Sequence, residues 1–285
     1  MLDGVISGLV SGSAYAILAV CVVTLYRLVG VLNFGQAAVG AVGAYSCFAL
    51  AGAGLPLPLA VLGGLAIAEA VAGLAGLAIA RWFGAPSETV RAVVSVVLFV
   101  VLLATGYRLF GDAPRVMPSL VPSAAFELAG VRISLTTVVA LAAAIAIAAG
   151  LSLILRFTRV GIRLQAMSER PTTVQLLGIN TRGLSLGVWA ATGMLSTLAL
   201  LLIAPTRNPT FESMSFLVVP ALAAGLLGAF SNVWIAVLGG LVIGAIEGAG
   251  SRIDLVSDYR GAIPFVVIIA ALIWLRRREV WDAAR

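Results

Sequence analysis

The sequence predicts an all-α protein, a polytopic transmembrane bundle of about nine helical spans. The first observation is composition: 61% of the 285 residues are apolar and 11% are charged, whereas soluble domains carry about 25% charged residues. The second is a mean hydropathy of +1.13. The third is run length, because several apolar runs reach the roughly 20 residues with which a helix crosses a bilayer. Their Gly- and Ala-rich character favours helices over the alternating strands of a barrel.

The apolar segments give the elements of this bundle in chain order. The first has no basic leader and no convincing cleavage site, so we expect it to be retained as a span. Pro220 lies inside the seventh, so we expect that helix to be broken or re-entrant and to line a cavity. The segments lie at 5–26, 31–50, 58–80, 90–110, 133–155, 184–204, 214–230, 232–250 and 262–275. No soluble domain is expected, and residues 1–285 form a single transmembrane domain.

Two polar stretches separate these apolar segments. Residues 111–132 contain three prolines and are expected to form an irregular loop outside the membrane. Residues 156–183 are rich in arginine and punctuated by glycine. Such a loop orients the neighbouring spans or docks a cytoplasmic partner. We favour docking, with an ordinary solvated loop as the alternative.

The arginines set the expected orientation, because basic residues accumulate in cytoplasmic loops. With residues 156–183 inside, twelve arginines face the cytoplasm and six face outward. The inner set is Arg27, Arg81, Arg91, Arg156, Arg159, Arg163, Arg170, Arg182, Arg276, Arg277, Arg278 and Arg285. The outer set is Arg108, Arg115, Arg132, Arg207, Arg252 and Arg260. The sequence therefore predicts a multi-pass protein of the cytoplasmic (inner) membrane, with its N-terminus outside and its C-terminus in the cytoplasm.

Composition also excludes several classes of function. The net charge is +6, but all eighteen basic residues are arginines that gather at span ends, so we expect a lipid membrane and no nucleic acid as the partner. The chain has no His and no Lys, so it lacks the commonest metal ligand and cannot form a P-loop. Cys21 and Cys47 lie in apolar segments, where a thiol packs as a small side chain. We expect no catalytic residue, no metal and no cofactor, and any ATP hydrolysis in a separate chain.

A few polar residues within the apolar segments are candidates for a solute path. Asn33, Gly35 and Gln36 begin the second segment and either line the path or form a capping box at a helix start. Pro220 and Glu247 complete the candidate set, and the alternative for Glu247 is simple pairing with a nearby arginine.

Three further features concern packing. Glu69 lies in the middle of the third segment, where we expect it to be protonated or inside the bundle. Glycines at intervals of four, Gly4-Gly8-Gly12 and Gly240-Gly244-Gly248, form ridges that allow close helix contact. We favour packing of these ridges within one subunit over a dedicated subunit interface.

Three blocks of the sequence point to one family. The first runs from GSAYAILA in the first segment through GVLNFGQ to Gly43-Ala44-Tyr45, and the third is the Gly-rich GGLVIGAIE. The second and most specific is RVGIRLQAMSERPTTVQLLGIN, in which a spaced set of residues falls in the family's order. On these blocks, which are distributed over most of the chain, the sequence resembles the permease subunits of branched-chain amino-acid ABC importers, the shorter of their two paralogous types.

The resemblance assigns a role to residues 156–183, within a single permease domain that spans residues 1–285. They would be a cytoplasmic coupling loop that seats on the ABC ATPase subunits. We expect Leu164, Met167, Val174 and Leu177 to bury against the ATPase. Gly178 would end the coupling helix, since glycine is favoured just past a helix C-terminus. The candidate coupling residues are Gly161, Arg163, Ala166, Met167, Glu169, Leu176, Leu177 and Gly178.

The same resemblance implies partners and a function. The partners would be cytoplasmic ABC ATPases, a second permease subunit in a homo- or heterodimer, and an extracytoplasmic solute-binding protein. The expected function is import of branched-chain amino acids or similar small polar solutes, with the chain as a transport subunit and not an enzyme. Two alternatives stay open: a urea or short-amide permease of the same build, and a stand-alone secondary carrier or channel.

Overall fold

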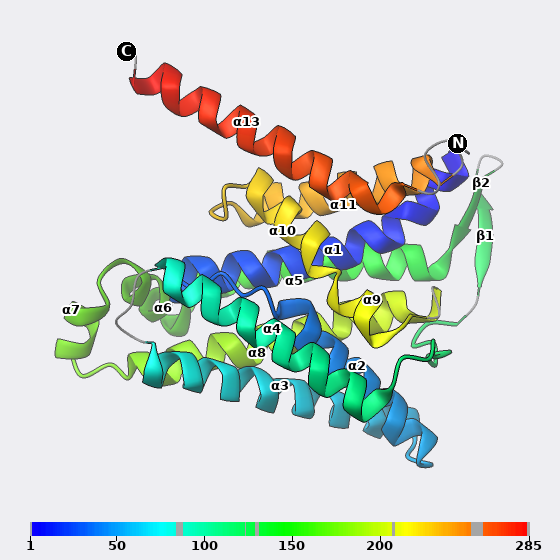
Figure 1. The fold of residues 1–285 in the computed structure, drawn as a ribbon, viewed down its shortest axis with the longest axis horizontal. Helices are drawn as coiled ribbons and strands as arrows, with labels where there is room; N and C mark the ends of the chain where they lie inside the picture. The colour runs from blue at the N-terminus through cyan, green and yellow to red at the C-terminus, as the bar shows by residue number, and fades with distance from the viewer. Residues whose placement is uncertain are drawn as a thin grey trace.

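The computed structural model of the chain describes residues 2–83, 88–122, 124–128, 131–206, 209–251 and 259–283. These residues form a helical bundle with one small β-hairpin (Figure 1). The elements are α1 (Leu2–Val29), α2 (Gln36–Gly52), α3 (Leu57–Trp82), α4 (Glu88–Phe110), β1 (Ala125–Leu128), β2 (Val131–Ser134), α5 (Leu135–Phe157), α6 (Arg159–Glu169), α7 (Pro171–Leu176), α8 (Thr181–Ile203), η1 (Ala204–Thr206), α9 (Phe211–Ser215), α10 (Val218–Leu227), α11 (Val233–Gly250), η2 (Arg260–Ala262) and α13 (Ile263–Ala283).

The predicted fold class is confirmed. Within the described residues, six helices are long and apolar enough to cross a membrane, and three shorter apolar helices accompany them. The long ones begin at Gly4, Leu57, Thr89, Leu135, Thr181 and Val233, and the shorter ones cover Gln36–Gly52, Phe211–Leu227 and Ile263–Ile273. Each of the nine apolar segments expected from hydropathy corresponds to one of these helices. The broken character expected near Pro220 is also present, because α9 and α10 are separate helices.

Helix α1 is the centre of the bundle, and residues 14–23 are almost completely buried. It lies along α11, and glycine determines how closely the two backbones approach. A methyl group at Gly8 would stand 2.2 Å from the carbonyl oxygen of Gly244, and one at Gly248 would stand 2.2 Å from that of Gly4. The two glycine ridges therefore meet each other inside one chain, as favoured from the sequence.

Helix α2 begins deep within the bundle and not at its surface, which corrects the expected span at 31–50. Residues 30–35 are not helical, and Val31, Asn33 and Gly35 are buried there. Gln36, the first residue of α2, contacts Thr192, which lies about 16 Å along α8 from its start at about 1.5 Å per residue. Hydropathy did not reveal this, because an apolar stretch has the same composition whether or not its backbone is helical.

The stretch expected as an irregular outer loop contains a β-hairpin, which is a second correction. Residues 111–122 are irregular, but β1 pairs with β2 as an antiparallel hairpin in which Ala125 lies opposite Ser134 and Leu128 opposite Val131. All three prolines precede the strands, so they interrupt the first half of the stretch only.

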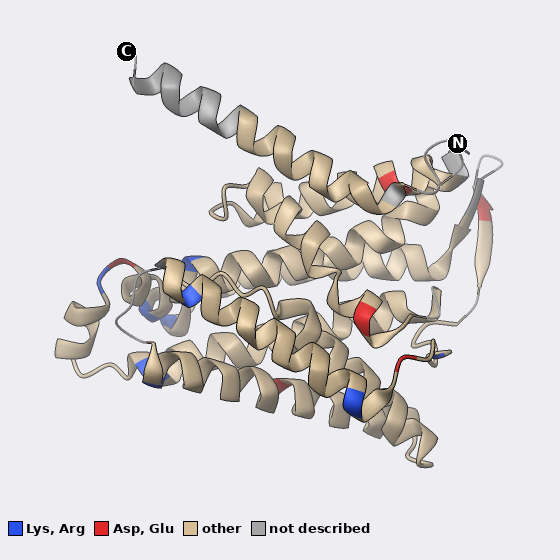
Figure 2. Ribbon diagram, in the orientation of Figure 1, with Lys and Arg blue, Asp and Glu red and all other residues tan. Residues whose placement is uncertain are grey.

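The bundle has two distinct ends. Figure 1 shows α6 and α7 at one end, and the N-terminus with the β-hairpin at the other. We call these the α6–α7 end and the hairpin end. Most described arginines gather at the α6–α7 end (Figure 2): Arg27, Arg81, Arg91, Arg156, Arg159, Arg163, Arg170 and Arg182. The side chains of Arg132, Arg207, Arg252, Arg260, Arg276, Arg277, Arg278 and Arg285 lie outside the described part of the chain.

The structure contradicts one of the two expectations for Glu69, namely that its side chain lies inside the bundle. It lies halfway along α3, on a face of the helix that is exposed in this single chain. Burial inside the bundle of its own chain is therefore wrong.

Candidate functional site

Helices α6 and α7 form the α6–α7 segment at one end of the bundle. Thr158 caps α6 by accepting a hydrogen bond from the Gly161 amide at 3.0 Å. Gly161 lies against the end of α5, where an added methyl group would stand 2.1 Å from the carbonyl oxygen of Ile154. Asn180 caps α8 in turn through the Gly183 amide at 2.9 Å. These glycines and helix caps thus fix how the α6–α7 segment is attached to α5 and α8.

The apolar residues of this segment divide into two sets, and this corrects the expected docking surface. Leu164 and Met167 are 7% exposed and Val174 is 3% exposed, because they pack within their own chain. They are therefore not available to bury against another protein. Leu176 and Leu177, by contrast, are 85% and 73% exposed.

The remaining candidates of this segment differ in exposure. Arg163 and Glu169 are exposed, and Ala166 is half-buried. Gly178 follows α7 with φ +77°, a left-handed conformation that suits glycine and ends α7 as expected. The single coupling helix expected here is instead divided at Arg170 into α6 and α7, because Pro171 begins a new helix. The outward surface of the segment therefore consists of charged residues of α6 and the Leu176-Leu177 tip of α7.

The two amides before α2 belong to a buried hydrogen-bond network. Asn33 Nδ2 donates to Gln36 Oε1 at 2.9 Å, and Asn33 Oδ1 accepts from the Gly35 amide at 3.0 Å. Gln36 Nε2 donates to the Thr192 carbonyl at 3.0 Å and to Ser196 Oγ at 2.7 Å. The capping-box alternative is wrong, because Gly35 is the N-cap of α2 and no side chain caps the helix.

A serine of α4 completes this network. Ser95 Oγ donates to the Leu32 carbonyl at 2.7 Å and accepts from the Phe34 amide at 3.2 Å. Non-helical backbone deep in a membrane protein needs such partners, since lipid offers none. Asn33 satisfies the Gly35 amide of this backbone and Gln36 links it to α8. Asn33, Gly35 and Gln36 do not line the cavity described next.

A cavity of about 970 Å³ lies toward the hairpin end of the bundle. It is bounded by the first turns of α1 and α5 and the last turns of α8 and α11, together with α9, α10 and the start of α13. Pro220 and Glu247, two of the candidates for a solute path, both line it. The size falls within the range of small-molecule sites in proteins, roughly 300–1,000 Å³.

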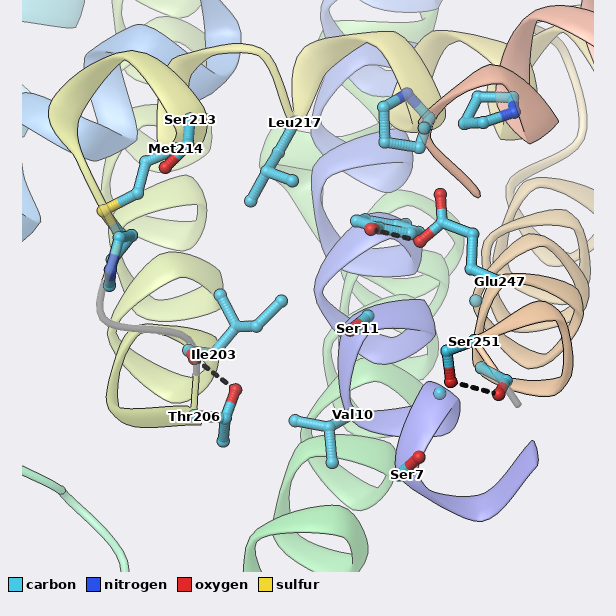
Figure 3. A pocket seen from close by; sticks show the side chains of 18 of the residues that line it. Ser7, Val10, Ser11, Ile203, Thr206, Ser213, Met214, Leu217, Glu247 and Ser251 are labelled. Atoms are coloured by element: carbon cyan, nitrogen blue, oxygen red, sulfur yellow. Dashed lines mark hydrogen bonds between the residues drawn. The ribbon is translucent and has the colours of Figure 1, made fainter. Parts of the chain in front are cut away.

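The lining of the cavity is mixed, because polar and apolar side chains lie next to each other on both of its sides (Figure 3). The polar lining residues include Ser7, Ser11 and Tyr15, spaced by four residues on one face of α1, Glu247 on α11, and Ser251, which follows α11. Among the apolar residues that line the cavity are Val10, Ile203, Met214 and Leu217. Among the described lining residues, Glu247 is the only acidic one and none is basic.

Glu247 is held by a residue from the opposite end of the sequence. Tyr15 donates a hydrogen bond to Glu247 Oε2 at 2.7 Å (Figure 3). Arg252, the partner expected from the sequence, lies outside the described residues. Sequence reasoning missed Ser7, Ser11 and Tyr15, although hydroxyl groups at every fourth position of an apolar helix are a recognisable signal of a polar face.

Comparison with known proteins places this architecture among transport proteins. Residues 4–272 match the family described as branched-chain amino acid transport system, permease component. The chain is 26% identical over 288 residues to the high-affinity branched-chain amino acid transport system permease protein BraD of Pseudomonas aeruginosa, which covers 96% of this chain and 93% of that protein. It is also 26% identical over 288 residues to LivH of Escherichia coli, a permease protein of the same description, over 95% of this chain and 92% of the relative.

A third relative is matched over a shorter region. The ribose import permease protein RbsC of Haemophilus influenzae is 28% identical over 127 residues, which cover 42% of this chain and 39% of that protein. No solved structure matches the chain. The six long apolar helices and the full-length relatives agree on a multi-pass membrane protein. The chain therefore belongs to the family of permease components of branched-chain amino acid transport systems.

Proposed function

We propose that this chain is the membrane-spanning permease subunit of a binding-protein-dependent ABC importer that carries branched-chain amino acids across the cytoplasmic membrane. The observation that carries this proposal is the match of residues 4–272 to one family, together with relatives matched over nearly their whole length. The mixed lining of the cavity supports the choice of solute, because an amino acid with an aliphatic side chain needs both polar and apolar contacts.

ATP hydrolysis is assigned to separate cytoplasmic subunits that dock on the α6–α7 end. The exposed Leu176 and Leu177 supply an apolar anchor, and Arg163 and Arg170 are exposed on the same α6–α7 segment. Central apolar residues carry most docking energy at such interfaces, whereas charges at the rim set orientation. The caps and glycine contacts that join α6 to α5 and α7 to α8 support a rigid transfer of motion into the bundle.

The arginines of the α6–α7 end also indicate how the chain is oriented in the membrane. The gathering of described arginines at the α6–α7 end supports a cytoplasmic location for it, with the hairpin end and the N-terminus outside. A solute-binding protein would then approach the hairpin end, toward which the cavity lies. A second permease subunit, identical or paralogous, completes the membrane part of the importer.

Uptake by the assembled transporter tests this proposal. The chain is co-produced with its ATPases, partner permease and binding protein, and uptake of radiolabelled leucine into proteoliposomes is measured with and without enclosed ATP. We expect uptake that requires ATP and binding protein together. Uptake of urea or acetamide but not of leucine would favour the alternative of a urea or short-amide permease. Leucine uptake by this chain alone, without ATPases, would overturn the importer in favour of a carrier or channel.

A further inference from the structure

We propose that Tyr26 and Phe230 form a gate in the transport path, and that a strained turn of the backbone sets how readily this gate opens. The inference rests on the proposed transport function and adds two gating residues to it. The gate separates the cavity from the α6–α7 end of the bundle between cycles of transport.

The first argument is that α1 and α10 lead from the cavity to the aromatic pair. Tyr15 of α1 lines the cavity, and Tyr26 lies on the same face about 16 Å further along, since eleven residues make about three turns. Pro220 of α10 also lines the cavity, and this helix continues to Leu227. The two helices therefore flank the cavity and meet again beyond it, where Phe230 contacts Tyr26.

The second argument is the packing of Phe230, which is half-buried. The centroid of its ring lies 5.5 Å from that of the Tyr26 ring. A methyl group at Gly225 would stand 2.9 Å from the Phe230 ring and 3.4 Å from Val23 Cγ2 of α1. At this point α10 itself has only a glycine facing α1, so the ring of Phe230 fills the space between the two helices.

The third argument is backbone strain in the turn that carries Phe230. Ala229 and Phe230 have φ of +49° and +50°, and among the described residues they are the only non-glycine residues with positive φ. Helix α10 ends with the hydrogen-bond pattern in which glycine usually occupies the position of Ala229. The Ala229 amide donates to the Leu226 carbonyl at 2.8 Å. The Phe230 amide donates to the Gly225 carbonyl at 2.9 Å.

This strain opposes the aromatic contact. The side chain of Ala229 is exposed, so the conformation is held by the hydrogen bonds of the turn and by the packing of the Phe230 ring. Strained residues of this kind gather at switch regions. The strain at one residue and an aromatic pair each correspond to a factor of about ten in an equilibrium constant. Contributions of similar size and opposite direction suit a gate, because a small push can change its state.

The fourth argument is the contact between the gate and the α6–α7 segment. Residues on either side of Tyr26 pack with α6 in one hydrophobic cluster, which contains Leu25, Leu28, Leu164 and Met167. A movement of α6 during the ATPase cycle therefore reaches the end of α1 through direct packing.

The test measures leakage of leucine through the complete transporter in proteoliposomes. The vesicles are loaded with radiolabelled leucine, and its efflux is followed without ATP and without binding protein. Phe230→Ala removes the ring that fills the gate, so we expect efflux at least about tenfold faster than from the natural transporter.

A second aromatic pair supplies a matched control for this variant. Phe99 of α4 is also half-buried, and its ring centroid also lies 5.5 Å from that of another ring, in Phe216. Phe99 does not line the cavity and has no part in the gate. Phe99→Ala should therefore leave the efflux of leucine unchanged.

A change of the backbone alone tests the role of strain. Ala229→Gly leaves the Phe230 ring in place and relieves the strained turn, which should favour the closed gate about tenfold. We expect a higher melting temperature together with ATP-driven leucine uptake that is lowered by up to about tenfold. The control is Ala53→Gly, because Ala53 is exposed, directly follows α2 and has an unstrained φ of −79°. Ala229→Gly also serves if Phe230→Ala does not accumulate in the membrane.

Two results count against the inference: efflux from Phe230→Ala no faster than from Phe99→Ala, or ATP-driven uptake by Ala229→Gly equal to that of Ala53→Gly. Either result leaves the proposed function standing if the natural transporter takes up leucine with ATP and binding protein. Failure of that uptake in the natural transporter counts against the proposed function itself.

Discussion

Gln36 and Ser196 are joined deep in the bundle by a hydrogen bond of 2.7 Å, in which the glutamine amide of α2 donates to the serine hydroxyl of α8. Both side chains are almost completely buried. This bond fixes the place where α2 begins and shields the non-helical residues that precede it.

Gln36→Leu should therefore destabilise the protein. The substitution leaves Asn33 and Ser196 without their buried partner, at a cost of about 1–3 kcal/mol for each group left unsatisfied. The apparent melting temperature of the purified protein in detergent measures the loss. Gln175→Leu is the control, because Gln175 makes an exposed hydrogen bond to Thr181 and its loss should shift the melting temperature little. Equal melting temperatures for the two variants would contradict the role given to the network.

Leu177→Asp should leave the protein folded but stop its association with the ATPases. Leu177 is 73% exposed, so a charge there costs nothing within the chain and removes an apolar anchor outside it, at about 2 kcal/mol or more. Co-purification with the ATPases and solute-stimulated ATP hydrolysis are the measurements. Val174→Asp is the contrasting variant: Val174 is 3% exposed, so this change should lower the melting temperature of the chain by itself. Normal ATPase binding by Leu177→Asp would remove α7 from the docking surface.

Gly178→Val should have the effect of Leu177→Asp by a different route. The residue has φ +77°, which a β-branched residue adopts only with strain, and the space around it is open, so crowding is not the cause. The exit of the chain from α7 would change direction and move the leucine tip. We expect lowered ATP hydrolysis in response to solute, and Gly178→Asn should retain more activity because asparagine tolerates this conformation. The proposal fails if valine and asparagine behave alike.

Gly8→Ala should destabilise the contact between α1 and α11. The new methyl group would stand 2.2 Å from the Gly244 carbonyl oxygen, and neither backbone can move away cheaply. Overpacking of this kind costs about 1–3 kcal/mol. Gly150→Ala is the matched control, since that helical glycine has no atom within 4 Å of the added group. Its melting temperature should be unchanged or slightly raised, because alanine favours a helix over glycine. A similar loss in both variants would show that helix propensity and not packing is being measured.

Labelling of single cysteines in whole cells tests the orientation. Ser119 and Ser168 are both exposed and lie at the hairpin end and the α6–α7 end respectively. We expect a membrane-impermeant thiol reagent to modify Ser119→Cys and to spare Ser168→Cys. The native Cys21 and Cys47 are buried and should not react. The reverse pattern would invert the proposed topology.

The sequence was sufficient for the apolar segments and their approximate positions, because hydropathy and length decide what a bilayer accepts. It was not sufficient for residues 30–35, since their apolar composition is compatible with both helical and extended backbone. The same limit applies to the α6–α7 segment. An amphipathic pattern shows that one face is buried, but not whether the partner is another chain or, as for Leu164 and Met167, the chain itself.

The candidate site was found only in part for a related reason. Pro220 and Glu247 stood out because a proline or a carboxyl group inside an apolar span is unusual. The partner of Glu247 did not stand out, because Tyr15 lies on the first helix and the pairing depends on long-range packing of α1 against α11. Local sequence also pointed to Arg252, which lies outside the described residues, so that pairing stays a prediction.

The glycine contact between α1 and α11 also has a consequence for biogenesis. Helix α1 leaves the ribosome long before α11, which is the partner of its glycine face. During most of translation that face is in contact with lipid, which fits a flat row of glycines poorly. Burial of the central helix is therefore a late step that needs nearly the whole chain. We expect chains that lack α11 to have an incompletely packed α1 and to be sensitive to membrane proteases.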